Sequence, residues 1–113
     1  MRRKHEIIEG RHISVWDDGP TFADRYTVVY LDAVSEGMFG NANVSYIAMG
    51  PAPFHPQGFC QHGEMALAAV TYKGRGGAFK KRVRFADLPM DCQRAVVRDI
   101  ADDAIRALPE VTP

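Results

Sequence analysis

Apolar and polar residues alternate along the N-terminal part of the chain in the manner of β-strands. Residues 25–31, RYTVVYL, are dense in β-branched and aromatic residues, and both faces of this segment are largely apolar, which predicts a central strand. Further strands are predicted at 12–16, 44–49 and 80–85. The sequence DDGP at 17–20 supplies turn residues, so we expect the first two strands to form an antiparallel pair.

The C-terminal part has the three- and four-residue spacing of an amphipathic helix, which we predict over residues 89–108. Pro89 suits an early helical position and Pro109 ends the helix. The predicted buried stripe is Val96, Val97, Ile100, Ala104 and Leu108, and the side chains assigned mostly to solvent are Arg94, Arg98, Asp99, Asp102 and Arg106. Strands followed by a helix predict an α+β fold: a small antiparallel sheet of four to five strands, with one C-terminal amphipathic helix packed on a face.

Composition and charge narrow the class of protein. A chain of 113 residues with an apolar share of 46% suits a single domain over residues 1–113, and residues 1–6 are expected to be loose. The 14 basic and 14 acidic side chains cancel, which argues against bulk electrostatic binding to nucleic acid or to an anionic membrane. No apolar run reaches the roughly 18 residues of a membrane-spanning helix. We therefore expect a cytoplasmic protein without a membrane partner.

The run PFHPQGFCQHGE at 53–64 concentrates the residues that are able to carry chemistry. If the run is extended, Cys60, His62 and Glu64 point to the same side, and His55 is a candidate fourth ligand for a zinc ion. A second interpretation takes Cys60 as a nucleophile and His62 as its base. However, the chain lacks the paired Cys or His spacings of most small zinc sites, and it offers no obvious oxyanion hole.

A third interpretation of the same run is a proline-ordered loop whose polar side chains hold its own backbone. The prolines remove amide donors, and the remaining irregular backbone needs hydrogen-bond partners. We therefore expect His55 or His62 to be substantially buried and bonded to main chain, without a metal between them. On this view His62→Ala lowers the free energy of unfolding by about 1–3 kcal/mol. Residues 65–72, MALAAVTY, fit a helix or a strand equally well.

A basic segment follows this run. Its cations are Lys73, Arg75, Lys80, Lys81, Arg82 and Arg84, with glycines before the last four and no acidic residue between 73 and 84. Such a segment is able to contact phosphates, which makes nucleic-acid binding one alternative. The alternative that we favour is a solvated edge strand, because charged side chains on an edge discourage aggregation and the net charge of the chain is zero.

Three segments together resemble a set of small proteins of bacteriophages, plasmids and other mobile elements. The segments are ADRYTVVYLD at 23–32, PFHPQGFCQHGE at 53–64 and KKRVRFADLPMDCQ at 80–93, and the order of the motifs matches from about residue 12 to residue 100. The set carries no known chemistry, so the resemblance transfers no catalytic residue, and Cys60 stands at a position that varies in it. It implies binding to host proteins, including inhibition of restriction or CRISPR defences.

The sequence thus favours a non-enzymatic binding protein with no cofactor and a host or phage protein as its partner. A loop that prolines hold in place loses little entropy when it docks, and its aromatic residues are able to act as anchors. The candidate partner-binding residues are Phe54, His55, Gln57, Phe59, Gln61 and His62. A metal- or Cys/His-dependent hydrolase centred on 53–64 and a nucleic-acid-binding module that uses 80–84 remain the alternatives.

Overall fold

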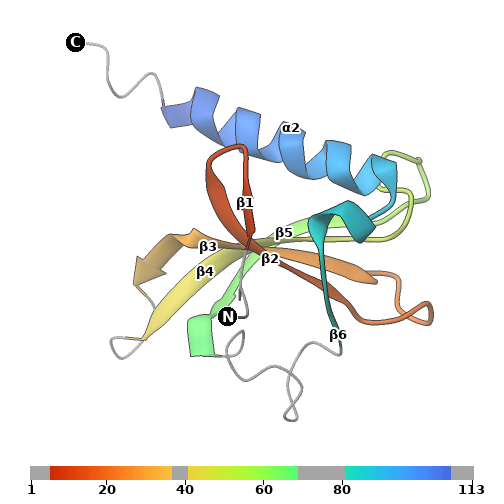
Figure 1. The fold of residues 1–113 in the computed structure, drawn as a ribbon, viewed down its shortest axis with the longest axis horizontal. Helices are drawn as coiled ribbons and strands as arrows, with labels where there is room; N and C mark the ends of the chain where they lie inside the picture. The colour runs from red at the N-terminus through yellow and green to blue at the C-terminus, as the bar shows by residue number, and fades with distance from the viewer. Residues whose placement is uncertain (1–5, 37–40, 69–80, 108–113) are drawn as a thin grey trace.

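The computed structural model describes residues 6–36, 41–68 and 81–107, and only the backbone of residues 103–107 (Figure 1). The strands are β1 (Glu6–Ile8), β2 (Arg11–Asp17), β3 (Tyr26–Glu36), β4 (Ala42–Met49), β5 (Cys60–Ala66) and β6 (Lys81–Val83). A 3₁₀ turn at Phe85–Asp87 leads into the helix α2 (Met90–Ala107). The predicted α+β class, an antiparallel sheet with a C-terminal helix, is confirmed.

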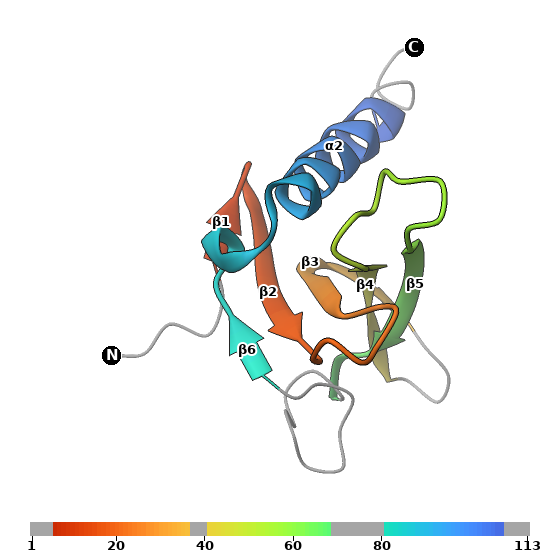
Figure 2. The ribbon, with the colours of Figure 1, turned by 90° about the vertical axis from the view of Figure 1, so that its right-hand side faces the viewer.

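The described strands form a single antiparallel sheet. The order across it is β1-β2-β3-β4-β5, and β6 pairs with β2. β3 occupies one side of β2, and β1 and β6 share the other. They are able to do so because β1 pairs with residues 11–13 of β2 and β6 with residues 15–17. Figure 2 shows this arrangement, with β1 and β6 beside β2 at one side of the sheet and β5 at the other. The predicted pairing of the first two long strands is confirmed as β2 with β3.

The main hydrophobic core lies between α2 and the sheet. β3 is central as predicted, and its residues from Tyr26 to Tyr30 are all buried. Val28 on β3 and Ile47 on β4 face the helix, which contributes Cys92 and Val96 to the same cluster. A smaller cluster on the other face contains Trp16, Val29 and Val44. Alternate residues of one strand therefore serve two clusters, which explains why both faces of β3 are apolar.

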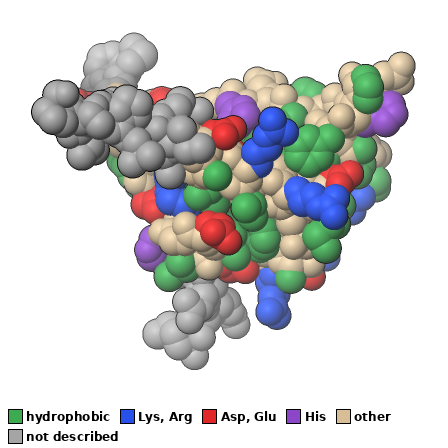
Figure 3. All heavy atoms as spheres, turned by 90° about the horizontal axis from the view of Figure 1, so that it is seen from above, with side chains coloured by type: hydrophobic (Ala, Val, Ile, Leu, Met, Phe, Trp, Pro, Cys, Tyr) green, Lys and Arg blue, Asp and Glu red, His purple; other side chains and the backbone are tan. Residues whose placement is uncertain are grey.

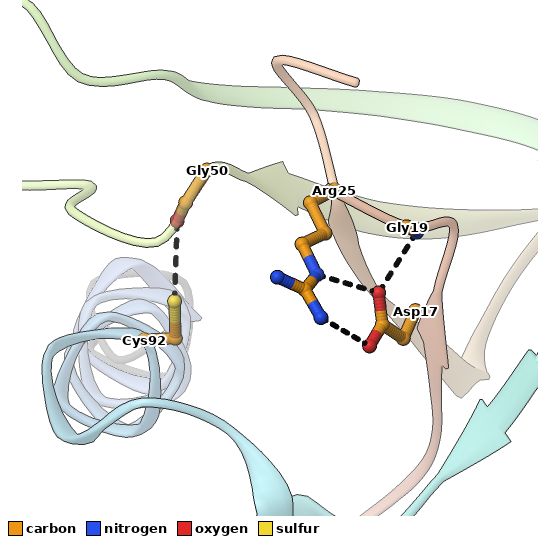
Figure 4. Close-up of polar contacts among 5 residues, drawn as sticks. All are labelled: Asp17, Gly19, Arg25, Gly50 and Cys92. Carbon is orange, nitrogen blue, oxygen red and sulfur yellow. Dashed lines mark hydrogen bonds and ion pairs between the residues drawn. The ribbon is translucent and has the colours of Figure 1, made fainter. Parts of the chain in front are cut away.

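Polar contacts at two places fix the ends of these elements (Figure 4). The Cys92 thiol donates to the Gly50 carbonyl over 3.2 Å and ties the start of α2 to the end of β4. Burial, with Asp91 and Cys60 as smaller causes, raises the pKa of Cys92 to about 11, so this thiol remains protonated. In the predicted turn after β2, the Asp17 carboxylate accepts bonds from Gly19 N at 2.9 Å and from Arg25 Nε at 2.8 Å.

Several sequence predictions differ from the structure in detail. The described sheet has six strands rather than four or five, because Cys60–Ala66 is a strand and Glu6 begins another. Of the undecided segment 65–72, Met65 and Ala66 belong to β5, Leu67 and Ala68 are helical, and the rest lies outside the described residues. Of the predicted strand 80–85, residues 81–83 form β6, Arg84 and Phe85 do not belong to it, and residue 80 lies outside the described residues.

The buried stripe of α2 differs in part from the predicted one. Val96 and Ile100 are buried as predicted, together with Cys92 and Ala95, but Val97 is 38% exposed. The side chain of Ala104 and the whole of Leu108 lie outside the described residues. Asp99, which we assigned to solvent, is only 18% exposed at its side chain. The spacing of 92, 96 and 99 follows the three- and four-residue steps of a helix as well as the predicted stripe does, and the sheet contacts that alternative set.

Candidate functional site: the proline loop and the pocket beside β5

The first candidate region is the segment between β4 and β5, residues 50–59, which we name the proline loop. Its backbone closes on itself: Gly50 N donates to Phe59 O at 3.0 Å, His55 N to Ala52 O at 3.1 Å, and Gly58 N to His55 O at 2.8 Å. The three bonds satisfy amides at the start, middle and end of the loop. The loop is therefore ordered by its own main chain rather than by burial in the core.

Two glycines of the proline loop lie where a side chain does not fit. A Cβ at Gly58 would overlap the carbonyl oxygen of Ala52, and a Cβ at Gly50 would lie 2.8 Å from the carbonyl oxygen of Ala23. In both cases the obstacle is backbone, which has no rotamer to change. Glycine is required at these positions because the chain approaches itself closely.

The proline loop presents most of its side chains to solvent. Phe54 is 48% exposed, His55 and Gln57 are exposed, and Phe59 is half-buried. The expectation that a histidine of this run is buried and bonded to main chain is wrong for His55 in one respect. Its Nδ1 accepts from Gln57 N at 3.0 Å, but the ring is exposed.

The expectation is wrong for His62 in both respects. His62 lies on β5, its side chain is 59% exposed, and its Nε2 lies 2.8 Å from Asp99 Oδ1 of α2. The physical reason is that residues 60–64 are not an irregular loop. β4 pairs with them as a regular strand, so their backbone does not depend on side chains for hydrogen bonds. His62 therefore contacts the helix instead.

β5 separates the candidate partner-binding residues. Cys60, His62 and Glu64 lie opposite Met49, Ile47 and Ser45, on the face that α2 covers, as predicted for an extended run. Gln61 belongs to the opposite face because side chains alternate along a strand. The six residues proposed for partner binding are thus divided between the proline loop and both faces of β5.

The second candidate region is a pocket between the sheet and α2, with a volume of about 470 Å³, which we name the β5 pocket. Its polar lining comes from Arg11 of β2, Tyr30 of β3, Ser45 of β4, His62 and Glu64 of β5, and Asp99 and Asp102 of α2. Most elements of the sheet and the helix thus contribute to it. Ile100 and Ala33 supply part of its apolar wall.

Carboxylates outnumber cations in the β5 pocket. Arg11 Nε pairs with Asp32 Oδ1 at 3.0 Å, and the guanidinium carbon lies 5.4 Å from the centre of the Tyr30 ring. Glu64 accepts a bond from the Ser35 hydroxyl at 3.3 Å. The pocket therefore contains one histidine, which contacts Asp99, and one arginine, which is paired with Asp32.

Cys60 does not have the properties of an activated nucleophile. The residue as a whole is exposed, but its thiol is partly buried. This burial, followed by the nearby Asp99 carboxylate, raises the pKa of Cys60 above the ordinary cysteine value. A raised pKa keeps the thiol protonated at neutral pH, and the thiolate is the reactive form. Within the described residues, no three Cys, His, Asp or Glu side chains are grouped as metal ligands, so the set His55, Cys60, His62 and Glu64 is not brought together.

The predicted basic segment is only partly described. Lys73, Arg75 and Lys80 lie outside the described residues, Lys81 and Arg82 lie on β6, and Arg84 precedes the 3₁₀ turn. Lys81 faces Asp17 in the register of β6 with β2. Figure 3, which looks onto α2, shows acidic, basic and apolar side chains interspersed on that face.

Sequence reasoning missed Asp99 as a site residue. The signal that identifies it is its spacing from two buried residues, since it follows Cys92 by seven positions and Val96 by three. A carboxylate that continues a buried stripe needs a partner, because burial of a charge is costly. His62 is that partner in the structure.

Comparison with protein-family models, with curated proteins and with solved structures gives no match. Within the described parts of the chain, no helix combines the length and the apolar character needed to cross a membrane.

Proposed function

We propose that this chain is a small binding protein that docks a protein partner through the proline loop. The observation that carries the proposal is Phe54, a large aromatic side chain that is 48% exposed on a loop ordered by its own backbone bonds. Aromatic residues on an ordered surface are the usual anchors of protein interfaces. A loop that is already ordered loses little conformational entropy on binding, which favours affinity.

The kind of partner is suggested by the resemblance of the chain to small proteins of mobile elements. We propose a cytoplasmic accessory protein of that type, which binds a host or phage protein stoichiometrically and inhibits a defence system such as restriction or CRISPR. His55 and Gln57 are exposed polar residues close to Phe54 in the sequence. They are suited to the rim of such an interface.

Affinity capture from a host lysate tests this proposal. The tagged protein should retain a specific partner, and the Phe54→Ala variant should lose it. Val34→Ala is the matched control, because Val34 is similarly exposed, at 55%, but lies on the part of β3 that pairs with the start of β4, whereas the proline loop follows the end of β4. Equal capture by wild type and Phe54→Ala contradicts docking through the loop. Turnover of a substrate by the purified protein, without any captured partner, contradicts a binding function.

A second candidate function rests on the contact between His62 and Asp99. When His62 Nε2 donates to Asp99, its Nδ1 is left as a proton acceptor in a pocket of about 470 Å³. This arrangement is that of a general base held by a carboxylate, and it supports a hydrolytic reaction with water as the nucleophile. The raised pKa of Cys60 gives the thiol no part in it.

Hydrolysis assays with generic ester, amide and phosphate substrates test the second candidate. His62→Gln and Asp99→Asn should each lower an activity of this site by a factor of at least about 100. Ser35→Ala is the control, because it alters a neighbouring hydrogen bond to Glu64 and leaves the His62–Asp99 contact intact. Elemental analysis of protein purified without a metal column tests the metal-dependent version. Activity that survives both substitutions contradicts this role of His62.

A further inference from the structure

The outer edge of β5 is a candidate interaction surface. β5 is the last strand in the order of the described sheet, and β4 is its only partner there. Sheet edges are usually protected by lysine, proline or a bulge. β6, at the other side, contains Lys81 and Arg82, whereas β5 reads CQHGEMA and contains none of these residues.

The pairing with β4 determines which backbone groups of β5 point outward. Gly50 N donates to Phe59 O, and bonded pairs alternate along an antiparallel ladder. The residues of β5 that bond to β4 are therefore Gln61, Gly63 and Met65. The N–H and C=O groups of Cys60, His62, Glu64 and Ala66 point away from β4, toward any strand that adds to this edge.

We propose that a second copy of this chain adds to this edge, so that the two β5 strands pair antiparallel about a two-fold axis beside Gly63. Gly63 is the middle residue of the seven in β5, so this register pairs the whole strand. It places Cys60 opposite the partner's Ala66 and His62 opposite the partner's Glu64. Every pair that forms hydrogen bonds in this register is made of residues whose backbone groups point outward.

Charge selects this register over its neighbours. In the two neighbouring registers that keep α2 of both chains on the same face of the sheet, the two-fold axis lies one residue away, at His62 or at Glu64. The first places two His62 side chains opposite each other, and the second places two Glu64 carboxylates opposite each other. The axis at Gly63 instead places each His62, the one side chain of β5 that is able to carry a positive charge, opposite a Glu64 carboxylate, and it keeps the two carboxylates apart.

Two further observations fit an axis at Gly63. Glycine has no side chain to obstruct the central pair, where the two backbones approach most closely, and on the face away from α2 the Tyr46 ring covers its position, since a Cβ there would lie 2.6 Å from Tyr46 Oη. Each chain has zero formal net charge with neutral histidines, so no net repulsion opposes the association of two copies.

Analytical ultracentrifugation of the full chain over a range of concentrations tests the proposal. The wild type should form a concentration-dependent dimer. His62→Glu places two carboxylates opposite each other in this register, and Glu64→Lys places a lysine opposite His62, so each variant alone should dimerise roughly tenfold more weakly. A mixture of the two variants should form a heterodimer, because the new glutamate then faces the new lysine and the other pair remains histidine with glutamate.

Two controls separate this result from misfolding. Thermal melts should show that both variants are folded, and heterodimer formation on mixing itself requires folded chains. Glu64→Pro removes an outward N–H without removing a bond to β4, and it should abolish the dimer. Hydrogen exchange should show that the amides of His62 and Glu64 gain protection as the concentration rises, while those of Gln61 and Gly63 are protected throughout.

A wild type that remains monomeric at the highest concentration it tolerates overturns the proposal. So does a dimer that persists unchanged in Glu64→Pro, or a mixture that associates no better than either variant alone, since both results place the interface elsewhere.

Discussion

The run of residues 53–64 divides into two parts that each contain a histidine, a glutamine and a glycine, and one part is a loop whereas the other is a strand. Residues 53–59 form most of the proline loop, where the main chain bonds to itself and the side chains are largely free. Residues 60–64 form most of β5, where β4 satisfies the backbone and His62 contacts the helix. The difference teaches that a histidine bonds to the backbone in the loop, where His55 accepts from Gln57 N, and contacts another side chain in the strand, where β4 satisfies the backbone.

The largest effect that separates the two parts is expected from Gly58→Ala in the proline loop. The new Cβ would overlap the Ala52 carbonyl, and backbone on both sides must move to admit it. We expect the free energy of unfolding to fall by about 3 kcal/mol, at the upper end of the cost of overpacking. Chemical denaturation measures this value, and a loss below about 1 kcal/mol would mean that the loop adapts more easily than its bonds indicate.

A smaller effect is expected from Gly63→Ala in β5. Its Cβ would lie 2.6 Å from Tyr46 Oη and 2.8 Å from the adjoining ring carbon, but a side chain is able to rotate away. We expect a loss of about 1 kcal/mol. In a double-mutant cycle, Tyr46→Ala should remove most of this loss, while it should leave the cost of Gly58→Ala unchanged. Additive losses at Gly63 and Tyr46 would contradict the proposed contact.

Acid should weaken the turn against which the base of the proline loop lies. Gly50 at the base of the loop lies against Ala23, in the turn that Asp17 and Arg25 hold. The hydrogen bonds from Arg25 and then Gly19 lower the pKa of Asp17 below 3.8, against the effect of burial. The folded-state pKa is depressed, so Asp17 stabilises the fold above its ordinary pKa, and this contribution is lost as the pH falls through the folded-state value.

Melting temperatures between pH 7 and pH 2 measure this contribution. Asp17→Asn should reduce the fall in stability below about pH 4, because the variant has no proton to bind at this position. Asp24→Asn is a matched control in the same turn, since the ion pair with Arg25 is made by Asp17. Parallel pH profiles for wild type and Asp17→Asn would show that the pair contributes no pH dependence.

The smallest effect is expected from His62→Ala. The ring is 59% exposed, and exposed ion pairs contribute about 0.2–1 kcal/mol. We therefore expect a loss of about 0.5 kcal/mol, below the range that a buried histidine would give. His55→Ala should cost no more, because water is able to replace the bond to Gln57 N. A loss above about 2 kcal/mol for His62→Ala would show that the contact with Asp99 is worth more than its exposure indicates.

The residue pattern predicted which segments form strands, turns and the helix better than it predicted which elements contact one another. The apolar character of both faces of 25–31 identified the central strand, and DDGP identified the turn, because these signals depend on a few neighbouring residues. β5 was missed because CQHGEMA contains no Val, Ile or Thr and no Phe, Trp or Tyr. Its strand conformation is imposed by pairing with β4, which overrides local preference.

The candidate site was predictable in its residues and not in its geometry. The alternation of Cys60, His62 and Glu64 on one face follows from strand conformation alone. The contact of His62 with Asp99 joins positions 37 residues apart, and it depends on which of two helical stripes faces the sheet. That choice depends on the surface of the sheet, and the periodicity of the helix contains no information about that surface.

The order of the elements, with α2 after the strands, has a consequence for synthesis on the ribosome. The strands from β1 to β5 precede it, so their antiparallel partners are all available once residue 66 has emerged. The apolar side chains that face α2, such as Val28 and Ile47, nevertheless have no cover until residues 90–107 emerge. A nascent chain without α2 therefore exposes the apolar face of the sheet that α2 covers, and it should depend on chaperones until α2 has emerged.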